Sequence, residues 1–296
     1  TTLFRSSFFA DQAKDLSGGR ITVNVFYGGT LFSDPDALNG LSSGVIDMAA
    51  LGHAPHADKL PLLCAAPDFA PGPAGNAVAY FDYLLNGSPV SAALGAEAEA
   101  NNIRYLGALA GGTNAFAAKY DFDDLTDLIA KSHSFGSMEK DKFTALGFTA
   151  VTAVFPWDYY DALGRGLIDS ACMSSSVMLS MGLNEVTSAW MYDGIYTAGS
   201  FLTVNLDWWN SLSDAQRTVL QAAADAASAY SVELVEGAVD NEKQTLTAAG
   251  IRLVTIGDQE AEHWLEIQID TKLAAADTAE KQAVVRAAAA YMGYSP

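Results

Sequence analysis

The residues of this chain whose types could support catalysis or metal binding are its histidines, a run of serines and two glycine pairs. A zinc site needs ligands at a set spacing, and His53 and His56 have neither an HExxH frame nor a cysteine cluster nearby. The run Ser174–Ser176 lacks the Gly-x-Ser-x-Gly turn that exposes the nucleophile of a serine hydrolase. The glycine pairs at 28–29 and 111–112 lack the G-x-x-x-x-G-K frame of a phosphate-binding loop. The sequence therefore predicts no enzyme activity, no metal site and no cofactor.

The composition is that of a folded, acidic protein. The chain has 296 residues, of which 50% are hydrophobic and 17% are charged, so it can bury a large core. Its 16 basic and 35 acidic residues give a formal net charge of −19. A surface this negative repels phosphate backbones, which argues against nucleic acid as a partner. No apolar run approaches the roughly 20 residues that a membrane-spanning helix needs.

The elements that must position any site begin with a helix, a strand and a second helix. A charged helix end breaks at Ser17–Arg20, and the alternation of apolar residues over 21–25 predicts a strand. A helix is predicted from Pro35 to Ser43 and a further strand from Val45 to Ala50. This order is typical of an α/β unit.

The alternation of strand and helix continues along the chain. Apolar runs over Ile103–Leu109 and Phe148–Phe155 predict strands, and helices are predicted over Asn76–Leu85 and Lys140–Leu146. Ser213–Val239 is alanine-rich and predicts a long helix with Ser213 as its N-cap. The sequence therefore predicts α/β layers followed by a long C-terminal helix.

Several motifs resemble those of the solute-binding proteins of tripartite ATP-independent periplasmic (TRAP) transporters, of the dicarboxylate-binding type. The resemblance extends from about Thr1 to about Leu253 and keeps the order and spacing of the family. The matching motifs are Ser17-Gly18-Gly19-Arg20, Gly44-x-Ile46-Asp47, Asp127-Leu128, Tyr160-x-Ala162-Leu163-x-x-Gly166-x-Ile168-Asp169, Asn205-x-x-Trp208 and Gly250-Ile251-Arg252-Leu253.

The resemblance implies a periplasmic-binding-protein-like α/β fold, with two α/β lobes joined by hinge strands and a long C-terminal spine helix. We expect lobe one to hold residues 1–111 and 199–238, and lobe two to hold 112–198 and 239–296. The hinge is expected at two glycine-containing crossings, Ala110–Thr113 and Thr197–Ser200. Family members also carry a strand ahead of the first helix, and this sequence opens inside that helix.

The resemblance also indicates a ligand site, and there the chain departs from its family. Members hold the ligand carboxylate with an arginine, whose planar fork pairs both carboxylate oxygens. Counting from the preceding aspartate-leucine pair, that position falls on Ser134; a second arginine corresponds to Asn114, and an asparagine to Met173. Lys131, on a predicted strand, and His133 are candidate replacement cations. Because losing a bidentate ion pair costs about 2–5 kcal/mol, we expect a small organic ligand other than a simple dicarboxylate.

Aromatic residues are candidates for the walls of the same cleft. The resemblance places Tyr27, His53 and Trp157 on loops or strand ends that face the cleft. Flat apolar walls with few polar groups suit a neutral, aromatic or hydroxylated molecule. Asn205, which opens the motif before the long helix, completes the candidate ligand-binding residues.

Two functions remain open at this stage. The first is a periplasmic solute-binding protein that captures a small organic molecule between its lobes and delivers it to TRAP membrane permease subunits. The second is a derived structural or accessory subunit of a larger membrane or surface assembly, which has lost ligand capture and binds a protein partner. Cys64 and Cys172 fall in different predicted lobes, so they are either a bridge opposing hinge motion or two free thiols.

Overall fold

The computed structural model describes residues 2–52, 54–67, 74–137, 140–191 and 197–294. The helices are α1 (Thr2–Leu16), α2 (Asp34–Ser42), α3 (Pro61–Ala65), α4 (Ala74–Asp82), α5 (Ser91–Ala100), α6 (Leu125–Lys131), α7 (Lys140–Ala145), α8 (Tyr159–Gly164), α9 (Ser175–Ser180), α10 (Leu206–Ser211), α11 (Asp214–Ala248), α12 (Asp258–Ala275) and α13 (Ala279–Tyr291). The strands are β1 (Met48–Leu51), β2 (Ile103–Ala118), β3 (Phe135–Gly136), β4 (Val151–Thr152), β5 (Ser170–Ser174), β6 (Ala189–Met191), β7 (Thr197–Asn205) and β8 (Arg252–Val254). The predicted α/β class is confirmed.

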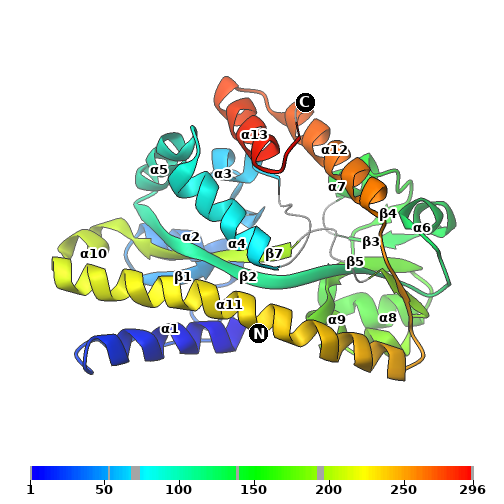
Figure 1. The fold of residues 1–296 in the computed structure, drawn as a ribbon, viewed down its shortest axis with the longest axis horizontal. Coiled ribbons are helices and arrows are strands. Elements are labelled where there is room, and N and C mark those ends of the chain that lie inside the picture. The colour runs from blue at the N-terminus through cyan, green and yellow to red at the C-terminus, as the bar shows by residue number, and fades with distance from the viewer. Residues whose placement is uncertain (1, 53, 68–73, 138–139, 192–196, 295–296) are drawn as a thin grey trace.

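Strand β2 belongs to both halves of the molecule. Its first part pairs antiparallel with β7, which pairs in turn with β1. Its second part pairs antiparallel with β5 and β6, and the sheet continues through β3 and β4 on one side and β8 on the other. In Figure 1, β2 runs through the centre of the molecule with helices above and below it. The result is two α/β lobes that share one long strand, as the resemblance implies.

Helix α11 satisfies the backbone of β2 where its pairing is irregular. The register between β2 and β7 skips Leu106 and Gly111. At the first irregularity, Gln221 Nε2 donates to the Leu106 carbonyl at 2.7 Å. At the second, the Ala110 amide donates to Ser231 Oγ at 2.8 Å. Because a buried backbone group without a partner costs about 1–3 kcal/mol, α11 stabilises the bent strand at both places.

Helix α11 begins where the sequence predicts and extends further. Ser213 Oγ accepts the Gln216 amide while the Gln216 side chain accepts the Ser213 amide, which is a capping box. The helix has 35 residues and ends at Ala248, beyond the predicted end at Val239. Leu246, near that end, is fully buried in lobe two, so tertiary packing favours the additional turns. The helix therefore runs along both lobes (Figure 1).

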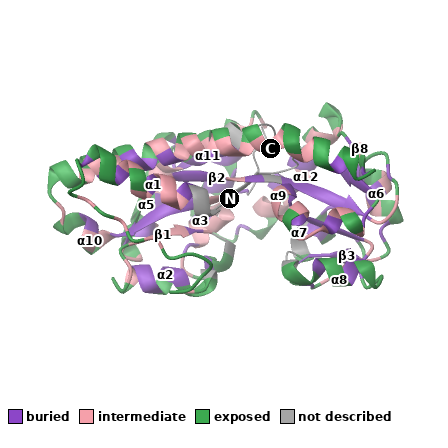
Figure 2. Cartoon of the chain, turned by 90° about the horizontal axis from the view of Figure 1, so that it is seen from below, coloured by how far each residue is buried: buried purple, intermediate pink, exposed green. Residues whose placement is uncertain are grey.

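Four apolar clusters form the core, and we name them after large members. They are the Tyr80 and Trp209 clusters of lobe one and the Phe135 and Trp190 clusters of lobe two. Neighbouring residues of β2 enter different clusters, since Ala115 joins the Trp190 cluster and Phe116 joins the Phe135 cluster. Each lobe therefore has apolar packing on both faces of its sheet. Figure 2 shows the strands buried between helices whose outer faces are exposed.

The predicted strand over 21–25 is wrong. Residues 21–27 have no regular secondary structure, although Ile21 and Val23 pack against the Trp209 cluster. A strand needs a neighbour for its backbone hydrogen bonds, and no described strand pairs with this segment. The strands predicted over 45–50 and 148–155 are also shorter or shifted, because only Met48–Leu51 and Val151–Thr152 are paired.

Two observations bear on the lobes as a whole. Cys64 and Cys172 form no disulfide, so the interpretation as separate thiols is confirmed and no bridge between them ties the lobes together. Within the residues that the structure describes, no helix is both long and apolar enough to span a bilayer.

We predict that replacing Gly112 with Ala lowers the free energy of unfolding by about 1–3 kcal/mol. Gly112 has φ +121°, and a Cβ atom there would lie 2.7 Å from Ser174 Oγ. The matched control is Gly95→Ala, in α5, where no atom lies within 4 Å of the new Cβ. This control should raise stability by about 0.5–1 kcal/mol, because alanine favours a helix interior. Urea unfolding measures both, and equal stability of the two variants would contradict the strained conformation.

Candidate functional site

The candidate site lies where β2 leaves the crossing and enters lobe two. Asn114 on β2 is the register partner of Ser174, the last residue of β5. Side chains of directly opposed residues lie next to each other on one face of the sheet. Ser174 Oγ is 3.1 Å from Ser176 Oγ, in the first turn of α9. One amide and two hydroxyl groups therefore gather beside the crossing strands.

Asn114 is the polar residue of this group whose side chain makes no hydrogen bond to the described part of the chain. The residue is only 4% exposed, but its side-chain nitrogen and oxygen are not among the fully buried polar atoms that lack a partner, so they reach solvent. An asparagine amide offers two donors and an acceptor, with which water or a bound molecule can pair. Asn114 is therefore suited to contact a bound molecule.

Ser134 lies at the opposite end of lobe two's parallel strands. Its hydroxyl donates to the Leu167 carbonyl at 2.9 Å and lies 3.1 Å from Thr152 Oγ1. The register of β3 against β5 places Ser134 about 16 Å from Ser174, at 3.3 Å per residue. The structure does not bring Ser134 and Asn114 together, and a ligand contact at Ser134 stays a prediction.

The side chains of Met173 and Asn205 do not lie beside that of Asn114 in the structure. Met173 is opposite Ala115, so it lies on the other face of the sheet and packs against the Trp190 cluster. Asn205 caps helix α10: its Oδ1 accepts the Trp208 amide at 2.8 Å, and its Nδ2 donates to the Leu41 carbonyl at 2.7 Å. These contacts are those of a buried structural cap. The ligand roles of both residues stay predictions.

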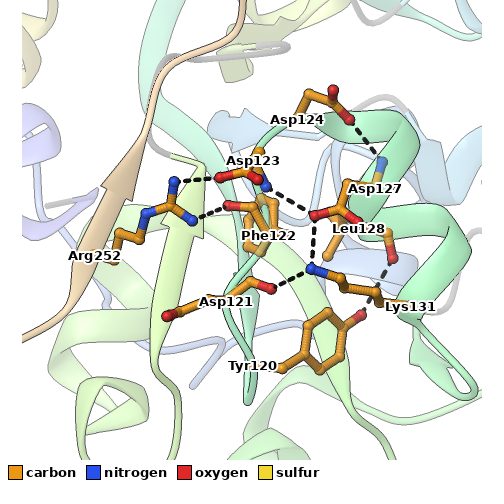
Figure 3. Close-up of polar contacts among 9 residues, drawn as sticks. All are labelled: Tyr120, Asp121, Phe122, Asp123, Asp124, Asp127, Leu128, Lys131 and Arg252. Carbon is orange, nitrogen blue, oxygen red and sulfur yellow. Dashed lines mark hydrogen bonds and ion pairs between the residues drawn. The ribbon is translucent and has the colours of Figure 1, made fainter.

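Lys131 ends helix α6 and does not lie on the predicted strand. Its ammonium is 2.8 Å from the Asp127 carboxylate and donates to the Asp121 carbonyl at 2.9 Å (Figure 3). The hydrogen bond from Lys131 holds the pKa of Asp127 below its ordinary value. A lysine in the last turn also complements the helix dipole, which explains why the helix persists to this residue. Lys131 is therefore engaged on the surface of lobe two, and His133 is exposed.

The polar network in Figure 3 also ties β8 to the segment that follows β2. Arg252 donates to the Phe122 carbonyl at 2.7 Å and pairs with the Asp123 carboxylate. This pairing raises the pKa of the Arg252 guanidinium. Exposed ion pairs contribute about 0–1 kcal/mol each, so the network mainly positions α6 and β8. It supplies no cation to Asn114.

The aromatic candidates lie on separate surfaces. Trp157 is 72% exposed and stacks on Phe155, with ring centroids 5.3 Å apart and planes at 7°. The Tyr27 hydroxyl lies 2.5 Å from Ser7 Oγ, beside a groove of about 480 Å³ between α1 and residues 23–27. His53 lies outside the described residues. The Phe155–Trp157 pair is a flat apolar surface that a ring of a ligand could cover.

Sequence reasoning missed Ser174 and Ser176 as members of the candidate site, because it tested the serine run for a nucleophile only. The available signal was their position at the end of the short apolar run 171–173, where Ser174 ends β5 and Ser176 lies in the first turn of α9. In α/β proteins, ligands bind beyond the carboxyl ends of strands. The pairing with Asn114 could not be read from the sequence, since it depends on the register between β2 and β5.

We predict opposite effects on stability for two buried asparagines. Asn205→Ala should lower the free energy of unfolding by about 1–3 kcal/mol, because it removes a cap and leaves the Leu41 carbonyl without its donor. Asn114→Ala should leave stability within about 0.5 kcal/mol, because no hydrogen bond within the described chain is lost. Chemical denaturation measures both changes. A loss at Asn114 as large as that at Asn205 would assign Asn114 a structural role.

Comparisons with known proteins show the family and the fold of the chain. The chain matches the family model of bacterial extracellular solute-binding proteins, family 7, over residues 4–273. It is similar to a TRAP periplasmic solute-binding protein from Ochrobactrum anthropi, whose C-terminus is bound in the ligand-binding pocket, at 19% identity over 99% of this chain and 90% of that one, with a TM-score of 0.84. It is also similar to one from Rhodoferax ferrireducens with bound malonate, at 18% identity over 98% and 92% of the two chains, with a TM-score of 0.81.

A third similar structure is a TRAP periplasmic solute-binding protein from a Sulfitobacter species with bound β-D-galacturonate, at 19% identity over 96% of this chain and 93% of that one, with a TM-score of 0.75. At these identities the structures show a shared fold, and nothing in them favours the alternative of an accessory subunit. The fold has two lobes that share strand β2 and are spanned by helix α11. Since the family model also matches nearly the whole chain, the protein belongs to family 7 of the bacterial extracellular solute-binding proteins.

Proposed function

We propose that this solute-binding protein captures a small organic molecule between its lobes and delivers it to the membrane permease subunits of a TRAP transporter. The grouping of Asn114, Ser174 and Ser176 beside the lobe crossing is the observation that carries this proposal. The TRAP proteins of similar fold support the transporter class. The periplasm is the proposed location, and the protein is proposed to bind and release its solute without transforming it.

The crossing strands are proposed as the hinge for this capture. Lobe one would hold residues 1–111 and 199–238, and lobe two would hold residues 112–198 and 239–296. Gly112 and Gly199 lie at the two crossings, and the irregular pairing at Gly111 provides backbone that can absorb a change of angle. A solute bound at Asn114, next to Gly112, would favour the closed arrangement by contacting both lobes.

The chemistry of the site favours an uncharged, hydroxylated solute. Asn114, Ser174 and Ser176 offer an amide and two hydroxyl groups, which donate and accept hydrogen bonds as sugar hydroxyls do. No basic side chain hydrogen-bonds any of these three within the residues described. A carboxylate there would lack the bidentate partner that stabilises a desolvated anion. The galacturonate and malonate of the similar structures are therefore proposed not to fit this site in the same way.

We predict that neutral sugars bind more tightly than their acid counterparts. D-Galactose against D-galacturonate, and D-glucose against D-glucuronate, differ only in the oxidation of one carbon. Calorimetry should give at least about tenfold higher affinity for the neutral member of a pair that binds, and nothing tighter than about millimolar for succinate or malate. Low-micromolar binding of an acid would contradict the proposed chemistry.

An engineered cation tests the position of the site. Asn114→Arg should shift the preference toward the acid of each pair, because it supplies the missing fork beside Ser174. The matched control Asn210→Arg adds the same charge on exposed α10 and should leave the preference unchanged. Equal effects of the two variants would show a general charge effect and remove Asn114 from the site.

Closure is predicted to accompany capture. Small-angle scattering of the free monomer, titrated with a library of neutral and acidic metabolites, should show compaction for the solute that binds. The free protein without metabolites is the control. Absence of compaction with every metabolite, together with purification of the protein in a stable assembly, would favour the accessory role.

A further inference from the structure

Helix α12 is part of lobe two by its packing. Trp264 is fully buried, and its ring meets that of Phe116 edge to face, with centroids 5.8 Å apart and planes at 87°. Leu265 and Ile269 belong to the same Phe135 cluster. These contacts are all with the apolar core of lobe two, so α12 moves with that lobe.

Helix α13 turns back toward lobe one and packs on both lobes. Val284 and Ala288 belong to the Tyr80 cluster of lobe one, whereas Val285 belongs to the Phe135 cluster of lobe two. At the end of the helix, Tyr291 stacks on Tyr83 of lobe one, with centroids 4.8 Å apart and planes at 25°. Helix α13 therefore fills the space between the two cores on this side of the molecule.

The end of α12 makes a direct polar contact with lobe one. Lys272 Nζ donates to the Cys64 carbonyl of α3 at 2.8 Å. Helix α3 is itself fixed to lobe one, because the Glu97 carboxylate of α5 accepts two backbone amides of its first turn at 2.6 and 3.0 Å. Burial raises the pKa of Glu97, while these hydrogen bonds and the charge of Lys281 on α13 act in the opposite direction. Lys272 thus contacts a helix that cannot shift independently of its lobe.

We propose that the α12–α13 hairpin is a second helical connection between the lobes, and that it sets their spacing when no solute is bound. Residues 279–294 would then move mainly with lobe one, whereas the sequence assigns them to lobe two. The inference rests on the proposed function in one respect, because solute capture is the reason for the lobes to move. The resting spacing of the lobes is a property of the free protein. Its elements are the Lys272–Cys64 hydrogen bond, the stacking of Tyr291 and the shared packing of α13.

The two helical connections lie on opposite faces of the crossing strands. In Figure 1, α11 lies below β2, and α12 and α13 lie above it. The clusters agree, since α11 packs in the Trp209 and Trp190 clusters while the hairpin packs in the Tyr80 and Phe135 clusters. Helix α11 is continuous, whereas the hairpin has a joint at residues 276–278. If the joint at 276–278 bends and the Lys272–Cys64 hydrogen bond breaks, the lobes can move without the unfolding of a helix.

Distance measurement on the free protein tests this inference without knowledge of the solute. Spin labels are placed by cysteine substitution at exposed Ala96 on α5 and Asp161 on α8, with Cys64 and Cys172 replaced by serine. Lys272→Met keeps the aliphatic stem and removes the ammonium donor. Double electron–electron resonance measures the distance between the two labels. The ratio between the populations of the shorter and longer lobe spacings should change by about tenfold, which corresponds to about 1.4 kcal/mol.

The matched control is Arg286→Met, on the exposed face of α13, which removes the same charge without removing the contact to Cys64. Its distance distribution should equal that of the unsubstituted protein. An unchanged distribution in Lys272→Met, or an equal change in both variants, would overturn the proposal. Thermal unfolding of each variant confirms that the fold is retained. Failure of every sugar to bind would count against the proposed function and would leave this measurement unaffected.

Discussion

The hydrogen bonding of β2 is the constraint on which the rest of the structure depends. One strand serves both lobes, and its pairing with β7 is irregular where it crosses between them. The backbone groups at these irregularities are buried, so they need partners from outside the sheet. Gln221 and Ser231 of α11 supply them, which fixes the helix against the strand. The long helix is therefore required by the crossing as well as by its own capping.

The crossing is also where we propose that a solute is recognised. Gly112 has no side chain, so Ser174 approaches the backbone of β2 closely, and Asn114 follows on the same strand. In the proposed site, recognition and bending would take place within a few residues of each other. A solute bound at Asn114 would act on the backbone that is proposed to bend, which would couple binding to closure. Because no described cation hydrogen-bonds Asn114, the proposed solute differs in kind from a simple dicarboxylate.

In the proposed hinge motion, the helices on both faces of the crossing would limit how far the lobes move. Helix α11 resists bending because it is continuous, whereas α12 and α13 meet at a joint and contact α3 through Lys272. Apolar packing of α13 against both cores is non-directional and tolerates small shifts. The hydrogen bond of Lys272 is directional and is lost when the distance grows. The proposed connection would therefore set the resting spacing of the lobes far from the proposed solute site.

Local chemistry alone determined the α/β alternation and the start of α11, because the capping box at Ser213 involves residues three apart. Tertiary structure decided the rest. The apolar alternation at 21–25 forms no strand without a described neighbour, and the strand predicted over 103–109 continues through the glycine-containing crossing to Ala118. The pairing of Asn114 with Ser174 and the return of α13 to lobe one were equally hidden. Each of these features depends on contacts between residues far apart in the chain. A sequence pattern indicates which face of a strand or helix is buried, but it does not indicate which residue packs or pairs there.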